Sequence, residues 1–580
     1  MRNNDVIFFN LHRRYLNQAP QFGGFIGTFI LAAVMNQNGY AAQGFAGTVM
    51  EGKRLIDEAC QSHKVSIIGL YCDYENVTEN IQICRYIKEK YHLPVMVGGP
   101  QATALGRDFL DESGCDVISR YEGELTVPEL LDYFLDGIGS LDTIKGIMYK
   151  KGNEVILNPE QNLIENLDAL PFIDDDCYLT GRKSDNQLSI MTGRGCPFHC
   201  AFCHEGHHTK KVRFRSIDNV MEEIEFFLSH RPHLHCYILF TDDTFTLIPA
   251  RVKELCQRLK KLRETYRFDW FCEGHIHTLY THPEMISYIA EAGAKRIQLG
   301  IEAGTQEVLD AYRKGSTLDE IRDVVVRCRD AGIDQIYSNI ILGGAFYTPE
   351  VYERNLQFAK ELIRLGKGCV EIGVVSYWPL AETEITNHPE KYDLKIVDKN
   401  FITSVGDFPQ TETDSLNRWD IVTMMRHMEE EIKTLMVDML RHDEVPTARI
   451  LSWIKGAEDD VVRGMWFLQL SSQPSLFAYY QMLASGECVQ SQQLTIPFLK
   501  AHPMRAVNLY RYIQKKSSGY VFFDYHLSEF EMQVLIYSTG KLSVQEIMKY
   551  VHADTEKEKA EVIDALKKME RDKMIVFCEI

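Results

Sequence analysis

The sequence has no surplus of positive charge. Its 580 residues include 63 Lys and Arg against 82 Asp and Glu, which gives a formal net charge of −19. Proteins that bind nucleic acid through its phosphates do so with Lys and Arg, whose binding releases counterions. We therefore expect no nucleic acid among the main partners of this protein.

Long apolar segments are also missing. The amino terminus reads MRNNDVIFFN and has neither the apolar segment nor the small-residue cleavage site of a signal peptide. The most apolar later stretch, Phe22 to Met35, contains three glycines. It is also shorter than the roughly 20 residues that a membrane-spanning helix needs. The sequence therefore predicts a cytoplasmic protein that does not bind membranes.

Cysteines, in contrast, are frequent, and only one group of them is clustered. In a cytoplasmic chain, the 15 cysteines are more often thiols or metal ligands than disulfides. Most stand singly in apolar surroundings, where a small buried hydrophobe explains them. Cys196, Cys200 and Cys203 instead fall in one short segment, GRGCPFHCAFC, and chance placement explains such a group poorly.

The first 140 residues predict five βα units. Short apolar runs separated by helical patterns begin at Val6, Ala41, Ser66, Val95 and Asp116. Continuous apolar strands joined by crossover helices are typical of a parallel sheet that is covered on both faces. We therefore expect residues 1–140 to form a flavodoxin-like, Rossmann-type domain with its ligand beyond the carboxyl ends of the strands.

A connector then separates this domain from a second βα series. Residues 141–185 hold a hairpin-like segment, GIMYKKGNEVILNP, and a polar stretch that ends in LDALPFIDDD. From 186 to 398, strands and helices alternate again through six βα units. Six units indicate an open, partial barrel of the TIM type, and the whole chain is accordingly of the α/β class.

Beyond residue 398 the pattern becomes mainly helical. In the last 55 residues, Ser528 with Glu531 and Ser543 with Glu546 fit the spacing of a capping box. Each pair opens an apolar periodic run, which is a signal for the start of a helix. We expect residues 399–580 to form a helical domain that ends in a winged-helix-like module.

The cysteine cluster follows the first strand of the second βα series, where barrel-like sheets build their active sites. A zinc site could be completed by a nitrogen of His204, His207 or His208. No second CxxC lies nearby to complete four thiolates, and Cys236, the next cysteine, falls in the following predicted strand. An incomplete set of thiolates better suits an iron–sulfur cluster with one exchangeable iron position.

The segment CPFHCAFC resembles the CxxxCxΦC signature of the radical S-adenosylmethionine superfamily, with Phe202 as the aromatic residue. The segment LFTDDTFT resembles the second strand region of the cobalamin-binding branch. The segment GIEAGTQEVL resembles its fourth strand region, with Ala303 of this chain in place of the usual serine. LDALPF and VGGPQAT resemble its connector and the fourth strand of its cobalamin domain. The chain is thus similar to class B radical S-adenosylmethionine methyltransferases.

This resemblance implies that Cys196, Cys200 and Cys203 ligate a 4Fe-4S cluster. S-adenosylmethionine would bind the fourth iron and yield a 5′-deoxyadenosyl radical after reduction by a donor such as flavodoxin or ferredoxin. The matching acids, Asp242, Asp243 and Glu302, would orient the cosubstrate's amino group or ribose hydroxyls.

Two points about this binding site stay open in the sequence. One aspartate of the pair Asp242 and Asp243 is expected to serve as a cap rather than to point inward. His275 and His277 stand near the third strand, where the family often has an arginine. The partner of the cosubstrate carboxylate is therefore not assigned.

For the cobalamin domain, the resemblance implies a corrin at the carboxyl ends of the strands. Many corrinoid proteins supply an axial histidine from a DxHxxG loop, where this chain has Asn10, His12 and Tyr15 in place of Asp, His and Gly. We expect cobalamin without a protein histidine ligand. The segments expected to contact it comprise Cys72, Asp73, Tyr74, Glu75, Asn76, Gly98, Gly99, Pro100, Gln101, Ala102, Tyr121, Glu122 and Gly123.

The leading hypothesis is methylation of an unactivated carbon, or of phosphorus, in a natural product or peptide, with methylcobalamin as the methyl donor. A radical rearrangement, ring contraction or cyclisation without methyl transfer uses the same residues and is the alternative. A cobalamin sensor or regulator is a third hypothesis, of another class. DNA binding is disfavoured, because Lys541 to Lys573 contain eight basic and eight acidic residues. The terminal module resembles peptide-binding domains, but it also fits a helical lid.

Overall fold

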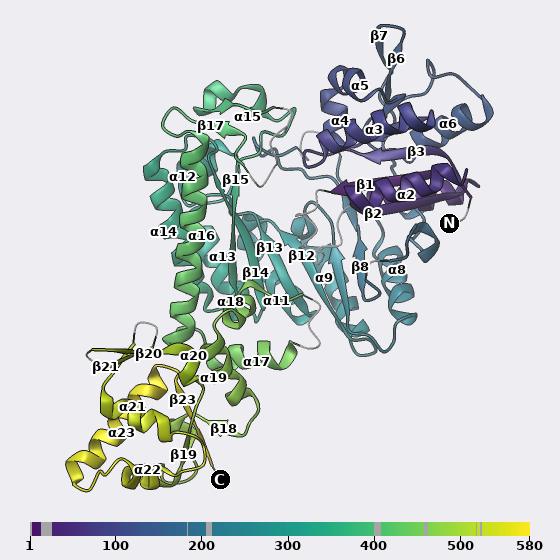
Figure 1. Ribbon diagram of the computed structural model, residues 1–580. Helices are drawn as coiled ribbons and strands as arrows, with labels where there is room; N and C mark the ends of the chain where they lie inside the picture. The colour runs from purple at the N-terminus through teal and green to yellow at the C-terminus, as the bar shows by residue number, and fades with distance from the viewer. Residues whose placement is uncertain are drawn as a thin grey trace. The chain divides into compact units, whose positions relative to one another are not determined.

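The computed structural model describes residues 3–12, 26–182, 184–204, 211–399, 408–457, 462–517, 519–522 and 525–579. The chain divides into two compact units, which are described separately (Figure 1). Unit 1 comprises Met1–Ala359 and Ile372–Met428, and unit 2 comprises Lys360–Glu371 and Glu429–Ile580.

The first sheet of unit 1 has seven strands in the order β2-β1-β3-β4-β5-β6-β7. Its first five strands are parallel, and all five strands predicted for the amino-terminal domain are confirmed. Their bounds are β1 Asn4–His12, β2 Ala42–Thr48, β3 Val65–Tyr71, β4 Val95–Gly98 and β5 Val117–Ser119.

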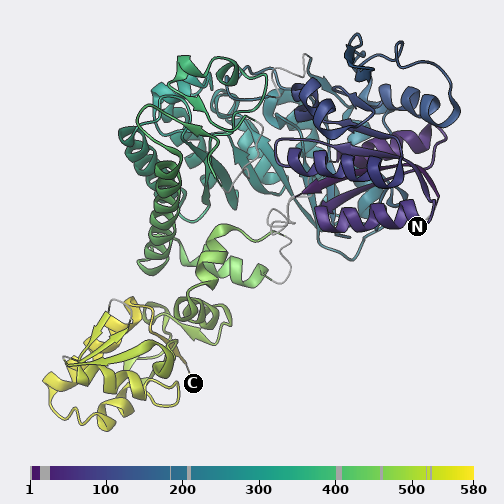
Figure 2. The same cartoon turned by 45° about the horizontal axis from the view of Figure 1, so that its top comes forward.

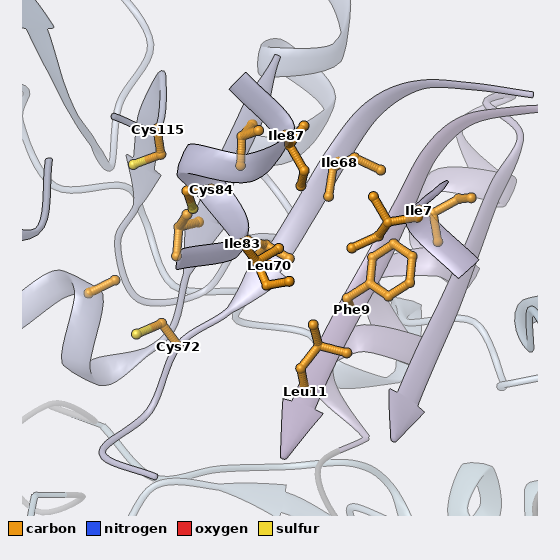
Figure 3. Close-up of a cluster of buried hydrophobic side chains, with 14 of the residues drawn as sticks. Ile7, Phe9, Leu11, Ile68, Leu70, Cys72, Ile83, Cys84, Ile87 and Cys115 are labelled. Carbon is orange, nitrogen blue, oxygen red and sulfur yellow. The ribbon is translucent and has the colours of Figure 1, made fainter. Parts of the chain in front are cut away.

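Helices cover both faces of this sheet because its strands are apolar on both sides. Ile7, Phe9 and Leu11 of β1 join the core on one face, against Ile83 and Ile87 of α3 (Figure 3). Residues of alternate parity, such as Val6 and Phe8, pack on the other face with α1 and α6. The helices are α1 Gly27–Gln37, α2 Val49–Gln61, α3 Val77–Tyr91, α4 Pro100–Leu105, α5 Arg107–Ser113 and α6 Thr126–Leu131.

The hairpin that the sequence assigned to the connector extends the first sheet. Strand β6 (Ile147–Lys151) pairs antiparallel with β5, and β7 (Glu154–Leu157) pairs antiparallel with β6. Tyr149 and Ile147 belong to the core on the α1 face. The hairpin is therefore part of the structure of the amino-terminal domain, and the polar stretch after it makes the connection to the second series.

The six strands of the second βα series form one sheet in the order β15-β14-β13-β12-β11-β8. The first and last strands are not paired with each other in this sheet, so it is an open, partial barrel as predicted. The strands are β8 Gln187–Ile190, β11 Cys236–Phe240, β12 Phe268–Gly274, β13 Ala294–Leu299, β14 Gln335–Leu342 and β15 Val370–Ser376. A short hairpin of β9 (Gly193–Arg194) and β10 (Arg213–Phe214) follows β8.

Crossover helices separate these strands. They are α8 Ile217–Ser229, α9 Pro249–Leu262, α10 Ile276–Thr281, α11 Glu284–Glu291, α12 Gln306–Ala311, α13 Leu318–Asp330 and α14 Pro349–Gly366. The periodic residues of α9, including Val252, Leu255 and Leu259, are buried. Short elements follow the last strand, namely α15 Glu384–Asn387, β16 Lys395–Ile396 and β17 Thr411–Glu412.

The carboxyl-terminal part is helical and ends in a small mixed module (Figure 2). Its helices are α16 Arg418–Arg441, α17 Thr447–Gly456, α18 Met465–Ser471, α19 Pro474–Ala484, α20 Leu509–Tyr512, α21 Glu529–Tyr537, α22 Val544–Tyr550 and α23 Glu556–Arg571. Both predicted capping boxes are confirmed, at Ser528 with Glu531 and at Ser543 with Glu546.

The module also contains two three-stranded antiparallel sheets. They consist of β18 Cys488–Val489, β23 Ile575–Cys578 and β19 His502–Arg505, and of β20 Ile513–Lys516, β21 Gly519–Phe522 and β22 Tyr525–Leu527. Three helices beside such hairpins are typical of a winged helix. None of the helices in the described ranges combines the length and hydropathy that a membrane-spanning segment requires.

Gly99, between β4 and α4, provides a test of this packing. Its φ is +107°, and an added Cβ would lie 2.4 Å from the carbonyl oxygen of Cys72. Gly39 has a similar φ of +93° but no atom within 4 Å of an added Cβ. Both alanine variants suffer backbone strain, and only Gly99→Ala adds a steric clash. We expect the thermal unfolding midpoint of Gly99→Ala to fall below that of Gly39→Ala by at least about 2–4 °C. Equal midpoints would show that the turn relaxes without cost.

Candidate active site

The cysteine loop lies at the carboxyl end of β8. Cys200 is 7% exposed, while Cys196 and Cys203 are partly exposed. The loop is held at Ala201, whose N–H donates to the Tyr312 carbonyl at 2.9 Å and whose carbonyl accepts from the Ile385 N–H at 3.1 Å. Two distant segments of the barrel thus fix the backbone between the second and third cysteines.

The donor set of this loop fits an iron–sulfur cluster with an open iron. Three thiols are provided, and the Sγ of Cys196 lies 3.3 Å from the Thr244 hydroxyl. Burial raises the pKa of Cys200, and the positive charge of Lys314 acts against that rise by favouring the thiolate. In the part of the chain that the structure describes, no three or more His, Cys, Asp or Glu side chains converge on a single-ion site.

The structure separates the roles of the two adjacent aspartates after β11. The buried carboxylate of Asp242 accepts hydrogen bonds from both the N–H of Thr192, at 2.6 Å, and its hydroxyl. Burial raises the pKa of Asp242 to about 6. Asp243 is exposed and accepts from the Gly195 N–H at 3.1 Å. Asp242 therefore caps the end of β8, and Asp243 keeps acceptor capacity beside the cysteine loop.

Glu302 and Lys314 form an ion pair that the sequence did not predict. Glu302 follows β13 with a left-handed φ of +64°, and its carboxylate lies 3.0 Å from the Lys314 Nζ. The side chains are only 14% and 11% exposed. Burial would lower the pKa of Lys314, but its electrostatic interactions with Glu302 and Cys200 outweigh burial and raise it. A buried cation therefore lies close to the cysteine thiols.

Aromatic rings line the same loop. Phe202 packs against Tyr312 with ring centroids 4.9 Å apart, and the Lys314 Nζ lies 5.8 Å from the Phe202 centroid. Phe198 stacks on His275 at 3.8 Å with an interplanar angle of 6°. Burial lowers the pKa of His275 to about 4, so the imidazole is neutral at pH 7.

The second of the two histidines near the third strand of the barrel has a different environment. His277 is half exposed and its Nδ1 lies 3.0 Å from Glu320. Of the two histidines that stand where an arginine is common, only His275 therefore packs on the cysteine loop. His204 is near the loop as well, with its Nδ1 3.3 Å from the Ala381 carbonyl oxygen. The other candidate zinc ligands, His207 and His208, lie outside the described residues.

Polar side chains form a row across neighbouring barrel strands. Glu273 on β12 is in register with Gln298 on β13, which is in register with Tyr337 on β14. Gln298 donates to Glu273 at 3.2 Å, and the Tyr337 hydroxyl donates to Asn339 at 2.9 Å. Burial, followed by the negative charge of Asp243, raises the pKa of Glu273 to about 7. This row offers several hydrogen-bonding groups beside the acids of the cysteine loop.

In the amino-terminal domain, a row of small and polar residues crosses the carboxyl ends of the five parallel strands. The strand registers join Ala46, Asn10, Tyr71, Gly98 and Ser119 in that order. A Cβ added at Gly98 would meet only the Ser119 carbonyl oxygen, at 3.5 Å. The row therefore leaves space on the face that is otherwise covered by α1 and α6.

Buried polar atoms on this face lack partners. Within the described ranges, neither polar side-chain atom of Asn10 has a hydrogen-bond partner, although Asn10 is fully buried. The hydroxyls of Ser119 and of Thr28, at the start of α1, are also buried without partners in those ranges. Unpaired polar groups are costly to bury. Their presence beside a row of small residues fits a site that receives a polar part of cobalamin, such as its nucleotide tail.

Several of the residues expected around the corrin also have a role in the fold. Asn76 is fully buried, and its amide donates to the carbonyls of Leu11 and Tyr71. Cys72 and Ala102 belong to the hydrophobic core of the sheet. The missing side chain of Gly99 allows its backbone to approach the Cys72 carbonyl.

The remaining expected contacts fall into two groups. Asp73 and Gln101 are buried with one polar atom each lacking a partner in the described ranges, and burial raises the pKa of Asp73 to about 7. Tyr74, Glu75 and Pro100 are only partly buried. For all five residues, contact with the corrin stays a prediction.

Residues 120–124, which follow β5, contact the hairpin of β9 and β10. Tyr121 has a left-handed φ of +60°, and Gly123 packs against Leu31 and Val127. The Glu122 carboxylate pairs with two arginines of the β9–β10 hairpin. The Glu122 carboxylate thus has a structural role, and its contact with the corrin stays a prediction. His12, at the end of β1, is partly buried, while Arg13 to Tyr15 lie outside the described residues.

Comparison with known families matches two segments of the chain. The B12 binding domain model matches residues 15–131, and the Radical SAM superfamily model matches residues 190–359. The solved structure of the cobalamin-dependent S-adenosylmethionine radical enzyme OxsB, with aqua-cobalamin bound, aligns with 98% of this chain and 80% of that chain. Its TM-score is 0.56 at 16% identity, which shows a shared fold.

Curated relatives match parts of the sequence. An uncharacterized methyltransferase of Pyrococcus horikoshii is 31% identical over 46% of this chain and 58% of its own length. The anaerobic magnesium-protoporphyrin IX monomethyl ester cyclase of Cereibacter sphaeroides is 26% identical over 41% and 40%. TokK of Streptomyces tokunonensis, a cobalamin-dependent radical SAM methyltransferase, is 26% identical over 60% and 52%. The chain spans less than two thirds of the length of each relative.

These matches show that residues 190–359 form a domain of the radical S-adenosylmethionine superfamily. More particularly, a B12 binding domain precedes it on the same chain, which is similar to the domain order of the cobalamin-binding branch. The predicted cofactors, a 4Fe-4S cluster, S-adenosylmethionine and cobalamin, are accordingly confirmed.

The two aspartates after β11 should respond differently to neutralisation. Asp242→Asn removes a buried, charge-assisted cap on β8 and should lower the iron retained after anaerobic reconstitution. Asp243→Asn should retain iron but weaken S-adenosylmethionine binding about tenfold or more, since one charge-assisted hydrogen bond is lost. Iron analysis and equilibrium binding measure the two effects. The opposite pattern, with full iron in Asp242→Asn and unchanged affinity in Asp243→Asn, contradicts the assignment.

Proposed function

We propose that this enzyme methylates an unactivated carbon of a natural product or peptide, using a 5′-deoxyadenosyl radical and methylcobalamin. The observation that carries the proposal is that loops at the carboxyl ends of both sheets touch. Tyr74 follows β3 of the cobalamin domain, Trp378 follows β15 of the barrel, and their ring centroids are 4.9 Å apart. Such an arrangement supports a shared substrate space between the two cofactors, which direct transfer of a methyl group requires.

When bound, the cluster and cobalamin would supply radical generation and a transferable methyl group. The residues of this chain would bind and orient the reactants. Cys196, Cys200 and Cys203 would hold the cluster. Asp243 would accept hydrogen bonds from the cosubstrate's amino group. Lys314 would pair with its carboxylate, which is the partner that the sequence left unassigned.

The other residues of the site would shield and position the cosubstrate. Glu302 would fix the Lys314 ammonium or accept from ribose hydroxyls. Phe202 and the buried Tyr312 would exclude water from the loop beside the thiols. Asp242 would act indirectly, by holding the end of the strand that leads into the cysteine loop.

The polar row of Glu273, Gln298 and Tyr337 favours a substrate with hydrogen-bonding groups over a purely hydrocarbon one. A natural product or a peptide satisfies this condition. We also propose that an external donor such as flavodoxin or ferredoxin delivers the electron and that the enzyme works in the cytoplasm.

A second candidate function is radical ring formation or rearrangement without methyl transfer. It is supported by the similarity to the magnesium-protoporphyrin cyclase, which matches 41% of this chain. The two candidates use the same cofactors and differ in the fate of the methyl group.

Methyl-deuterated S-adenosylmethionine separates the candidates. With reductant, cobalamin and the true substrate, product mass should rise by one labelled methyl group. S-adenosylhomocysteine and 5′-deoxyadenosine should form together, because methyl donation and radical formation would each consume one molecule of the cosubstrate. Cys196→Ala should abolish 5′-deoxyadenosine formation. Unlabelled product accompanied by 5′-deoxyadenosine, without S-adenosylhomocysteine, would instead support the ring-forming reaction.

Cobalamin should bind without coordination by His12. Asparagine at position 10 brings no negative charge that would fix the histidine as a ligand. The spectrum of bound cobalamin should therefore be that of a form without a nitrogenous lower ligand, and His12→Ala should leave it unchanged. Asn10→Leu should weaken binding, because it removes the buried polar group without much change in volume. A spectral shift in His12→Ala would identify His12 as the ligand.

A further inference from the structure

A buried ion network links the cobalamin domain to the hairpin that opens the cysteine loop. Glu122 follows β5 and pairs with Arg213 of β10 through two contacts, of 2.6 Å and 3.0 Å. Glu122 also lies 3.1 Å from Arg194 of β9, and Arg194 pairs with Glu124. Two acids from one domain thus meet two arginines from the other. We infer that this network couples the cobalamin site energetically to the cluster and cosubstrate site.

The network is buried on both sides. The side chains of Arg213 and Glu124 are 3% and 7% exposed, and those of Arg194 and Glu122 are 14% and 15% exposed. Burial would lower the pKa of Arg194, but the charges of Glu124 and Glu122 outweigh it and raise the pKa. Charges buried this deeply are weakly screened by salt, and the loss of one partner leaves the other uncompensated.

Each end of the network lies next to a cofactor loop. Arg194 is two residues before Cys196, and the N–H of the intervening Gly195 donates to Asp243. Glu122 lies three residues after Ser119, the last residue of the row with unpaired polar groups. A change at either cofactor loop therefore reaches the other through one layer of paired side chains.

The connector is tied to the same charges. The N–H of Ile164 donates to Glu122 at 3.0 Å, and the Ile164 carbonyl accepts from Arg213 at 2.7 Å. Three segments that are far apart in the sequence thus share one carboxylate. When one segment shifts, the geometry of the others must change, because paired charges with fixed geometry do not deform smoothly. Such a shared element is the physical requirement for linkage between two sites.

The inference rests on the proposed function only in that both cofactors must bind. Linkage predicts that S-adenosylmethionine tightens cobalamin binding and that cobalamin tightens S-adenosylmethionine binding by the same factor. In reconstituted full-length protein we expect about fivefold or more, which is the lower end of typical coupling. Equilibrium dialysis with hydroxocobalamin, with and without saturating S-adenosylmethionine, measures the factor in one direction. Titration with S-adenosylmethionine, with and without cobalamin, measures it in the other.

Glu122→Gln should reduce this coupling factor to about two or less, while both ligands still bind. Glu124→Gln, which leaves the bidentate pair of Glu122 and Arg213 intact, should reduce it partly and serves if Glu122→Gln folds poorly. The matched control is Glu223→Gln. Glu223 pairs with Arg215 at 2.6 Å, and both side chains are less than 9% exposed. This pair lies entirely within the barrel, so its loss should leave the factor at the wild-type value.

The outcomes separate the inference from the proposed function. Three outcomes would overturn the coupling although both cofactors bind. The wild-type protein could show a factor of one, or both Glu122→Gln and Glu124→Gln could retain the wild-type factor. Glu223→Gln could also lose as much of the factor as these two variants do. Absence of cobalamin binding in the wild type overturns the coupling and the proposed function together.

Discussion

Parallel strands end at the same edge of their sheet, and both cofactor sites of this enzyme depend on that constraint. In the barrel, the loops after β8, β11 and β13 bring the cysteines, Asp243 and Glu302 together, although they come from three separate segments of the chain. In the first sheet, the strand registers carry Asn10, Gly98 and Ser119 into one row. Side chains at these edges are free to serve ligands because the hydrophobic cores lie between the sheets and their helices.

Much of this arrangement could be predicted from the sequence. Buried parallel strands are continuous apolar runs, so the strands of both series are visible without knowledge of their partners. The cysteine spacing is local, so the loop proposed to hold the cluster stands out in the sequence alone. The hairpin of β6 and β7 was recognised, but its pairing with β5 was not, because pairing between strands depends on contacts that a local pattern does not contain.

The parts that could not be predicted all depend on contacts over long distances in the chain. Adjacent aspartates look alike in sequence, and only the approach of Thr192 makes Asp242 the cap and leaves Asp243 available. Lys314 belongs to an ordinary helix-end pattern, AYRKG, and becomes notable only when Glu302 is found beside it. The pairing of Glu122 with two arginines from another domain likewise leaves no signal in the local sequence.

The distribution of buried charge separates structural from functional roles. Where every buried polar atom is satisfied, as in Asn76 or in the pair of Arg215 and Glu223, the protein gains order and has no capacity left for a ligand. Where such atoms lack partners in the described ranges, as in Asn10 and Ser119, the cost of burial must be offset when something binds. The acids of the satisfied network, Glu122 and Glu124, and the unsatisfied row at Asn10 belong to the same amino-terminal domain. Rigid support and an incomplete binding surface are therefore adjacent, which is the arrangement that allows ligand binding to be transmitted to the cysteine loop.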